Sequence, residues 1–225
     1  GLSLHGSGRR LTVNADYNFQ QVLHLRETNS TGHNQQWQVA ADAEIVERIG
    51  FVNVRTTRSQ QNQTNVGRIS SDNLSTANRT DVTTFSVTPR VTHRFGRWAE
   101  TEFSVTYDVV SNDTGPTDTT SESIGGRTSI RSGSRFQKMP WSVDINRREQ
   151  TNTDDSTSKF STLDARASYV ISRRWSVDFG AGYDKNEFVS GTNNEDGLRW
   201  RSGVTWTPTP RTRLGAGYEK RFFDD

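Results

Sequence analysis

The feature that most constrains this chain is an alternation of apolar and polar residues with a period of two. In the stretch 11–25 the odd positions from Leu11 to Phe19 are apolar, while the even positions from Thr12 to Asn18 are polar. Successive side chains of a β-strand point to opposite faces of its sheet. The stretch is therefore predicted to be a strand with one apolar and one polar face.

The same alternation predicts about twelve strands along the whole chain. Further apolar registers run through 37–45, 52–56, 83–91, 99–109, 139–145, 163–171, 175–183, 198–206 and 212–218. Leu2 and Leu4 end an earlier strand, and the Gly-containing stretch 123–131 is a less regular one. None of the apolar registers holds a charged residue, although 24% of the chain is charged.

The composition does not suit a conventional folded core. Only 30% of the residues are apolar and the mean hydropathy is −0.84, whereas globular domains use roughly 45–50% apolar residues. Disorder does not fit either, because the chain has 6 Trp, 11 Phe and 5 Tyr and a net charge of only +2. An antiparallel up-and-down transmembrane β-barrel resolves this, since only one face of each strand must then be apolar. A soluble extracellular β-sandwich that binds glycans is the alternative.

The connections between the predicted strands alternate in length. Short turns are predicted at 5–9, 47–49, 95–97, 132–135, 172–174 and 208–210. Long polar loops are predicted at 28–34, 60–81, 111–120, 149–158 and 185–197. Short turns on one side and long loops on the other are typical of bacterial outer-membrane barrels. We therefore expect the chain to lie in the outer membrane.

Charge is also sorted by the kind of connection. Arginines gather at the short turns, where they can pair with phospholipid head groups, and acids gather in the long loops, where they can share divalent cations with anionic outer-membrane glycolipid. The same distribution follows if both ends simply need to be soluble, and the sequence leaves both interpretations open. The pI near 9.1 does not indicate a nucleic-acid partner, because the arginines are spread over the turns.

Two further sets of residues follow from the barrel prediction. An aromatic girdle at each membrane interface is expected from rings near the strand ends: Trp37, Trp98, Tyr107, Trp141, Trp175, Tyr183, Trp200, Trp206 and Tyr218. The lumen is expected to be lined by charged residues of the polar registers: Asp16, Asp42, Glu44, Arg90, Glu100, Glu102, Asp108, Asp144, Arg166, Asp178, Arg199 and Arg201. Their mixed signs predict ion pairs across strands instead of a pore with one dominant charge.

No motif in the sequence points to catalysis. His24 and His33 near the outer loops could belong to a rim hydrolase, but no spacing supports this and solvated rim histidines are the simpler interpretation. Glu100 and Glu102 lie on one face, where two carboxylates could serve a glycosidase; a charge ladder with Arg90 is the simpler interpretation. The chain has no Cys and no EF-hand pattern, so we predict no catalytic residues, no metal site and no cofactor.

Several stretches carry a resemblance to a known family: 71–74 with 78–80, 86–89, 93–96, 107–110, 182–184 with 186–188, 206–212 and 220–223. In order and spacing they resemble the uncharacterised outer-membrane β-barrel proteins associated with the PEP-CTERM and exosortase system of exopolysaccharide-producing bacteria. The resemblance implies a place near polysaccharide export machinery. It implies no functional residues, because the family has no established activity.

The function expected from the sequence is a non-enzymatic channel or scaffold linked to exopolysaccharide export. Its expected partners are the lipid bilayer, outer-membrane glycolipid, and exopolysaccharide or its export machinery. Residues 1–225 are expected to form one outer-membrane β-barrel domain, truncated at both ends, because the first and last strands place both termini on the loop side. A signal peptide is expected upstream of Gly1, since export requires one.

Overall fold

The computed structural model describes residues 1–22, 32–61, 80–113, 118–188 and 195–224. It has twelve β-strands: β1 (Leu2–Ser7), β2 (Leu11–Val22), β3 (Gly32–Val46), β4 (Gly50–Gln61), β5 (Thr80–Phe95), β6 (Ala99–Asp113), β7 (Thr119–Ser132), β8 (Trp141–Asn152), β9 (Thr157–Val170), β10 (Trp175–Phe188), β11 (Glu195–Thr209) and β12 (Thr212–Asp224). Within the described part of the chain, no helix is long and apolar enough to cross a membrane.

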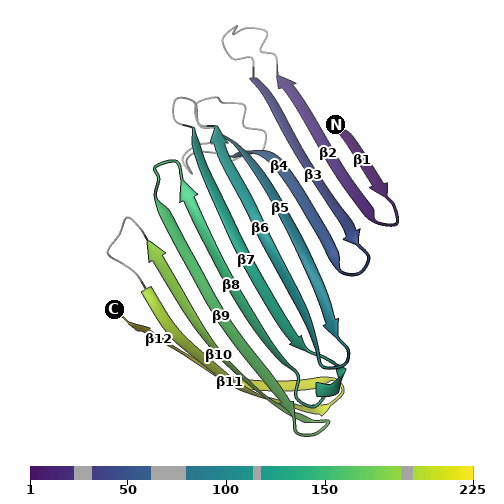
Figure 1. Cartoon of the computed structure of the whole chain (residues 1–225), viewed down its shortest axis with the longest axis vertical. Coiled ribbons are helices and arrows are strands. Elements are labelled where there is room, and N and C mark those ends of the chain that lie inside the picture. The colour runs from purple at the N-terminus through teal and green to yellow at the C-terminus, as the bar shows by residue number, and fades with distance from the viewer. Residues whose placement is uncertain (23–31, 62–79, 114–117, 189–194, 225) are drawn as a thin grey trace. The chain divides into compact units, whose positions relative to one another are not determined.

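The strands form one sheet in which each strand pairs with its neighbours in sequence, from β1 to β12 (Figure 1). This is the up-and-down topology that the alternation predicts. Among the described residues the order begins at β1 and ends at β12, so these two strands are the edges of the sheet. The single sheet is not the two-sheet arrangement of a soluble sandwich.

By internal packing the chain falls into two compact units, each described by itself. The first comprises Gly1–Pro89, Thr106–Ser123 and Thr151–Asp155. The second comprises Arg90–Val105, Ile124–Gln150 and Ser156–Asp225.

In both units the register keeps the predicted apolar positions together on one face of the sheet, which we call the apolar face. In the first unit Tyr17 pairs with Leu2 and Trp37. In the second, Tyr183 pairs with Leu163 and Leu198. The charged registers share the other face, which we call the polar face.

The apolar face is exposed. Phe179 is 55% exposed and Leu2 is 71% exposed, and Val82 is the one buried hydrophobic residue among those described. Large hydrophobic side chains are normally buried in a soluble protein. Their exposure here, without an apolar core, fits a sheet whose apolar side meets lipid.

Three of the short turns have the expected tight geometry. Ile49 N–H donates to the carbonyl of Val46 at 3.0 Å, and Trp98 N–H donates to that of Phe95, also at 3.0 Å. Gly96 between β5 and β6 has φ of 58°, a conformation that glycine adopts at little cost. The turn between β9 and β10 closes with Trp175 N–H bonded to the Ser172 carbonyl.

The prediction that connection lengths alternate strictly is wrong at two places. The predicted long loop 149–158 is a turn of only four residues, 153–156, because β8 runs to Asn152 and β9 begins at Thr157. The predicted short turn 132–135 is longer, spans 133–140 and contains a 3-10 helix, Ser134–Phe136. In the first case the polar residues up to Asn152, which suggest a loop, continue strand β8, and Asp155 in the turn takes a positive φ of 60°.

Candidate functional site

The charged residues of the polar face meet most closely on β9 to β12, in the second unit. Four of the predicted lumen residues lie here: Arg166, Asp178, Arg199 and Arg201. Three glycines share this face and face charged partners on adjacent strands: Gly180, Gly182 and Gly203. Without side chains of their own, these glycines let neighbouring long side chains lie across them.

The site contains two rows, each made of three residues paired across β9, β10 and β11. The first row is centred on Gly182 of β10. Gly182 pairs with Asp164 on β9 and with Arg199 on β11. Arg199 lies so close over it that a Cβ at Gly182 would be 2.6 Å from Arg199 Nε. From there Arg199 donates to the Asp164 carboxylate at 2.6 Å and pairs with Asp184 at 3.2 Å. One arginine therefore joins two acids, all three being less than a third exposed.

The second row, centred on Gly180, has the same backbone pattern with a different charge. Gly180 pairs with Arg166 on β9 and with Arg201 on β11. Arg201 lies over this glycine as Arg199 lies over Gly182, since a Cβ at Gly180 would be 2.8 Å from Arg201 Nε. The residue on β9 is here a second arginine in place of an acid.

The acids around the second row point to other partners. Glu219 pairs in register with Arg201, but its carboxylate lies 3.0 Å from Arg221 Nε. Asp178 lies over Gly203, where a Cβ would be 2.7 Å from both of its carboxylate oxygens. A cavity of about 150 Å³ opens here and is lined by Arg166, Arg201, Glu219 and neighbouring residues.

Elsewhere in the second unit the polar face also carries the predicted ion pairs. Arg90 lies 4.0 Å from Glu102, and Arg94 lies 3.5 Å from Glu100. The two glutamates therefore have separate arginine partners, where the sequence assigned both to Arg90. Asp144, on β8, accepts from Arg127 at 3.1 Å.

In the first unit, acids of the polar face bond mainly to neutral groups. Asp42 accepts from Asn53 at 2.7 Å, and Glu44 accepts from the backbone N–H of Arg48. Asp108 accepts from Ser123 at 3.4 Å. Asp16 lies in the same register, opposite Gln38.

Of the aromatic residues predicted as girdles, four lie at or near strand ends, namely Trp98, Trp141, Trp175 and Trp206, whereas the other five lie further inside their strands. Several of these rings are in contact. Trp175 and Trp206 stack with ring centroids 5.5 Å apart, and Trp200 lies 5.2 Å from Tyr218. Trp98 and Trp141 each lie 6.1 Å from Phe136.

Two of the three tyrosines and Trp37 make polar contacts. Tyr183 donates to Asp196 at 2.5 Å and Tyr107 donates to Glu122 at 3.3 Å. The Trp37 ring lies 5.3 Å from the Arg58 guanidinium. An apolar ring with a polar contact at its edge suits the membrane–water interface.

On β10 an ion pair lies beyond Tyr183, where the apolar register has given way to charged residues. Lys185 Nζ is 2.5 Å from the Glu187 carboxylate. The hydrogen bond to Glu187 raises the pKa of Lys185, and the same bond lowers the pKa of Glu187. Both side chains therefore stay charged at the end of β10, beyond the stretch of the strand with apolar side chains.

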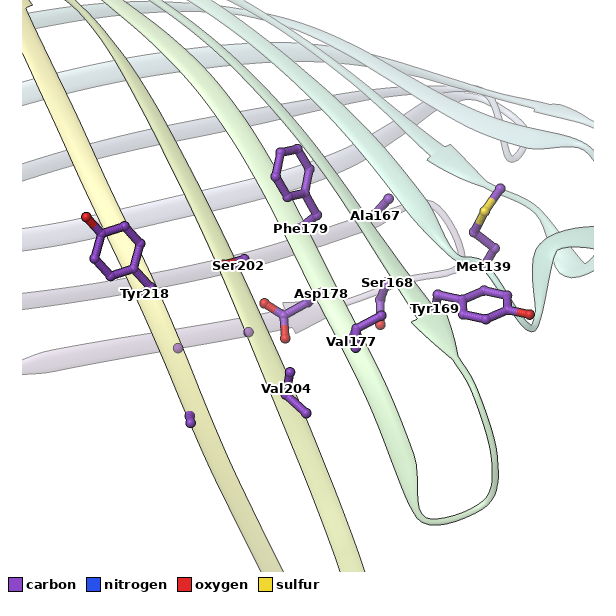
Figure 2. Close-up of a pocket in the computed structure, with 13 residues that line it drawn as sticks. Met139, Ala167, Ser168, Tyr169, Val177, Asp178, Phe179, Ser202, Val204 and Tyr218 are labelled. Atoms are coloured by element: carbon purple, nitrogen blue, oxygen red, sulfur yellow. The ribbon is translucent and has the colours of Figure 1, made fainter.

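The apolar face of the second unit also has a shallow hollow of about 610 Å³ on β9 to β12 (Figure 2). Small side chains such as Ala167 and Ser202 form its floor, with the rings of Tyr169, Phe179 and Tyr218 around them. Its lining is mostly apolar, as expected of a surface against acyl chains, although Ser168 and Asp178 of the polar registers also border it.

The residues considered for catalysis are not brought together in the described part of the chain. His24 lies outside the described residues, and the side chain of His33 is not described. His5 on β1 bonds to Asn14, its partner in register on β2, and His93 packs edge-on against Phe95. Among the described residues, no group of three or more His, Asp or Glu side chains is placed to hold a metal ion.

Sequence reasoning missed two charged residues of this site and the role of its glycines. Asp184 and Arg221 continue the polar registers beyond the predicted girdle positions, so following the alternation further would have found them. The glycine rows depend on which residues of three strands lie side by side. That register is not visible in the sequence of any one strand.

A single antiparallel sheet with an exposed apolar face that carries aromatic rings, and with paired charges on the opposite face, defines a β-barrel of the outer-membrane class. Solved structures of OmpT, an outer membrane protein of Vibrio cholerae, have this fold. In-vitro folded OmpT is 11% identical, with a TM-score of 0.50 over 96% of this chain and 88% of that one. Its trimer form gives 11% identity and 0.50 over 95% and 89%. A loop L8 deletion mutant gives 10% identity and 0.50 over 96% and 95%.

These likenesses confirm the predicted fold, and with it the outer membrane as the place where proteins of this fold lie. No protein-family model matches the chain, and no curated protein sequence matches it.

Proposed function

We propose that this chain is a non-enzymatic channel or scaffold of the outer membrane that serves exopolysaccharide export. The observation that carries the proposal is the polar face, whose charged side chains form cross-strand pairs and leave small polar cavities between them. A wall of this kind suits contact with water and hydrophilic solutes. The resemblance of the sequence to exosortase-associated barrels supports the link to polysaccharide.

The proposed partners follow from the two ends of the strands. The bilayer contacts the apolar face, and the girdle residues meet its head groups. Acidic residues in the loops bind outer-membrane glycolipid through shared divalent cations, and the polysaccharide or its export machinery meets the polar face.

The test uses the full chain, refolded into detergent and then into planar bilayers. The expected result is stepwise conductance, or binding of an acidic polysaccharide to the inserted protein. A heat-unfolded sample in the same detergent is the control. Inserted protein with neither conductance nor polysaccharide binding would contradict the proposal. Hydrolytic activity that disappears in His24→Ala would favour a rim hydrolase instead.

A further inference from the structure

Two adjacent rows of the polar face are built alike but carry different charges. In each row a glycine of β10 lies between a residue of β9 and an arginine of β11 that lies flat over the glycine. In the row of Gly182 the β9 residue is Asp164, and Arg199 reaches its carboxylate at 2.6 Å. In this geometry the arginine side chain of β11 crosses the glycine and extends toward the residue on β9.

In the row of Gly180 the same geometry brings two arginines toward each other. Arg201 makes nearly the same approach to its glycine as Arg199 does, with Cγ at 3.1 Å from the Cβ position in both rows. The residue it approaches is Arg166, whose nearest carboxylate, that of Asp164, is 3.9 Å away and already bonded to Arg199. Within the described part of the chain, Arg201 has no ion pair.

The nearby acids do not fill the space between these two guanidinium groups. Glu219 is held by Arg221 and Asp178 lies over Gly203. Two like charges on either side of a glycine repel each other, and an anion between them would remove that repulsion. Arginine also binds oxyanions with paired N–H donors.

We propose that Arg166 and Arg201, on either side of Gly180, form a binding site for an oxyanion group of a solute in the lumen. The cavity of about 150 Å³ that both arginines line has room for such a group but not for a whole sugar chain. The site therefore binds the acidic substituent of a larger hydrophilic molecule, a carboxylate or a sulfate. The inference rests on the proposed function, because it requires solutes to reach the polar face.

Binding is measured on the full chain refolded in detergent micelles, by calorimetric titration with sodium glucuronate, sodium sulfate and, as the neutral probe, glucose. Wild-type protein should bind at least one of the two anions and not glucose. Binding of both shows that charge is recognised, and binding of glucuronate alone shows preference for the planar carboxylate. Binding of neither anion, or equal binding of glucose, would overturn the proposal.

Three variants test the geometry. Arg201→Gln should weaken anion binding about tenfold or more, the effect of losing a charge-assisted hydrogen bond. Arg166→Asp makes the second row a copy of the first and should abolish binding, because Arg201 then has an internal partner. Gly180→Ala keeps every charge but places a methyl group 2.8 Å from Arg201 Nε, so it should also weaken binding.

Arg213→Gln on β12 is the matched control, since Arg213 does not line the cavity and this change removes the same charge. Unchanged binding in all three site variants, or an equal loss in Arg213→Gln, would refute the site. Conductance of the same samples separates the two proposals. Wild-type protein that conducts without binding anions contradicts only the site, and protein that binds anions without conducting contradicts only the channel.

Discussion

At the scale of single residues, the polar face depends on glycines as much as on charges. Gly182 lets Arg199 lie flat and reach both Asp164 and Asp184. A larger residue at this position would lift the arginine away from the sheet. In the middle of a strand, glycine otherwise lowers the stability of the folded protein by roughly 0.5–1 kcal/mol relative to alanine. Its presence here is therefore explained by the close approach and not by strand stability.

Gly182→Ala is accordingly expected to destabilise the folded protein by about 1 kcal/mol, because the loss of a half-buried charged hydrogen bond exceeds the gain from alanine. Urea unfolding in detergent, followed by tryptophan fluorescence, measures the change. Gly217→Ala, with only an ordinary 3.5 Å contact to the Ser202 carbonyl, is the matched control and should not destabilise. In an Arg199→Met background Gly182→Ala should no longer destabilise, because only the gain from alanine is left; an unchanged destabilisation there would contradict this account.

At the scale of elements, the sequence predicts where the strands lie better than where they end. Alternation locates the strands because each of them has lipid on one side and polar groups on the other. It fails to show their ends, since strand residues beyond the apolar band are polar on both faces, as at the end of β8 near Asn152. The connection 133–140 could not be predicted either, because its shape comes from contacts with the turn before β6.

That connection shows how an irregular segment is fixed. Gly133 N–H donates to the Trp98 carbonyl at 2.7 Å, and Arg135 N–H donates to that of Arg97 at 3.0 Å. Phe136 lies between Trp98 and Trp141, and the Arg135 guanidinium lies 4.1 Å from the Trp98 ring. The segment thus packs on its neighbour through backbone and rings together.

Gly133→Ala should disrupt this packing. A Cβ at this position would be 2.3 Å from the Arg97 carbonyl oxygen, and backbone cannot move aside as a flexible side chain can. We expect a loss of about 2–3 kcal/mol, as for overpacking of a tight site. Urea unfolding measures it, and faster tryptic cleavage at Arg135 should accompany it. Gly126→Ala on β7, where a Cβ meets nothing within 4 Å, is the control. Equal stability of the two variants would show that the connection is not closely packed.

At the scale of the whole molecule, the same alternating register both builds the sheet and assigns its two environments. A soluble fold would bury the apolar register, but here it is exposed and Val82 is the one hydrophobic residue buried in the described part of the chain. Stability must therefore come from cross-strand hydrogen bonds and from lipid against the apolar face. An arginine introduced on the apolar face should therefore destabilise the folded protein, whereas an arginine introduced on the polar face should be tolerated.

Phe179→Arg and Ser168→Arg test this consequence. Phe179 lies midway between the girdle residues Trp175 and Tyr183 on β10, so an arginine there should cost about 2–4 kcal/mol in a bilayer. Ser168, on the polar face of β9, pairs in register with Asp178, and an arginine there meets an acid. Refolding into lipid vesicles, followed by heat-modifiable gel mobility, should show a lower folded fraction and lower urea midpoint for Phe179→Arg only. If both variants fold as well as wild type, the apolar face does not meet lipid; if both fail alike, the two faces do not differ as the register requires.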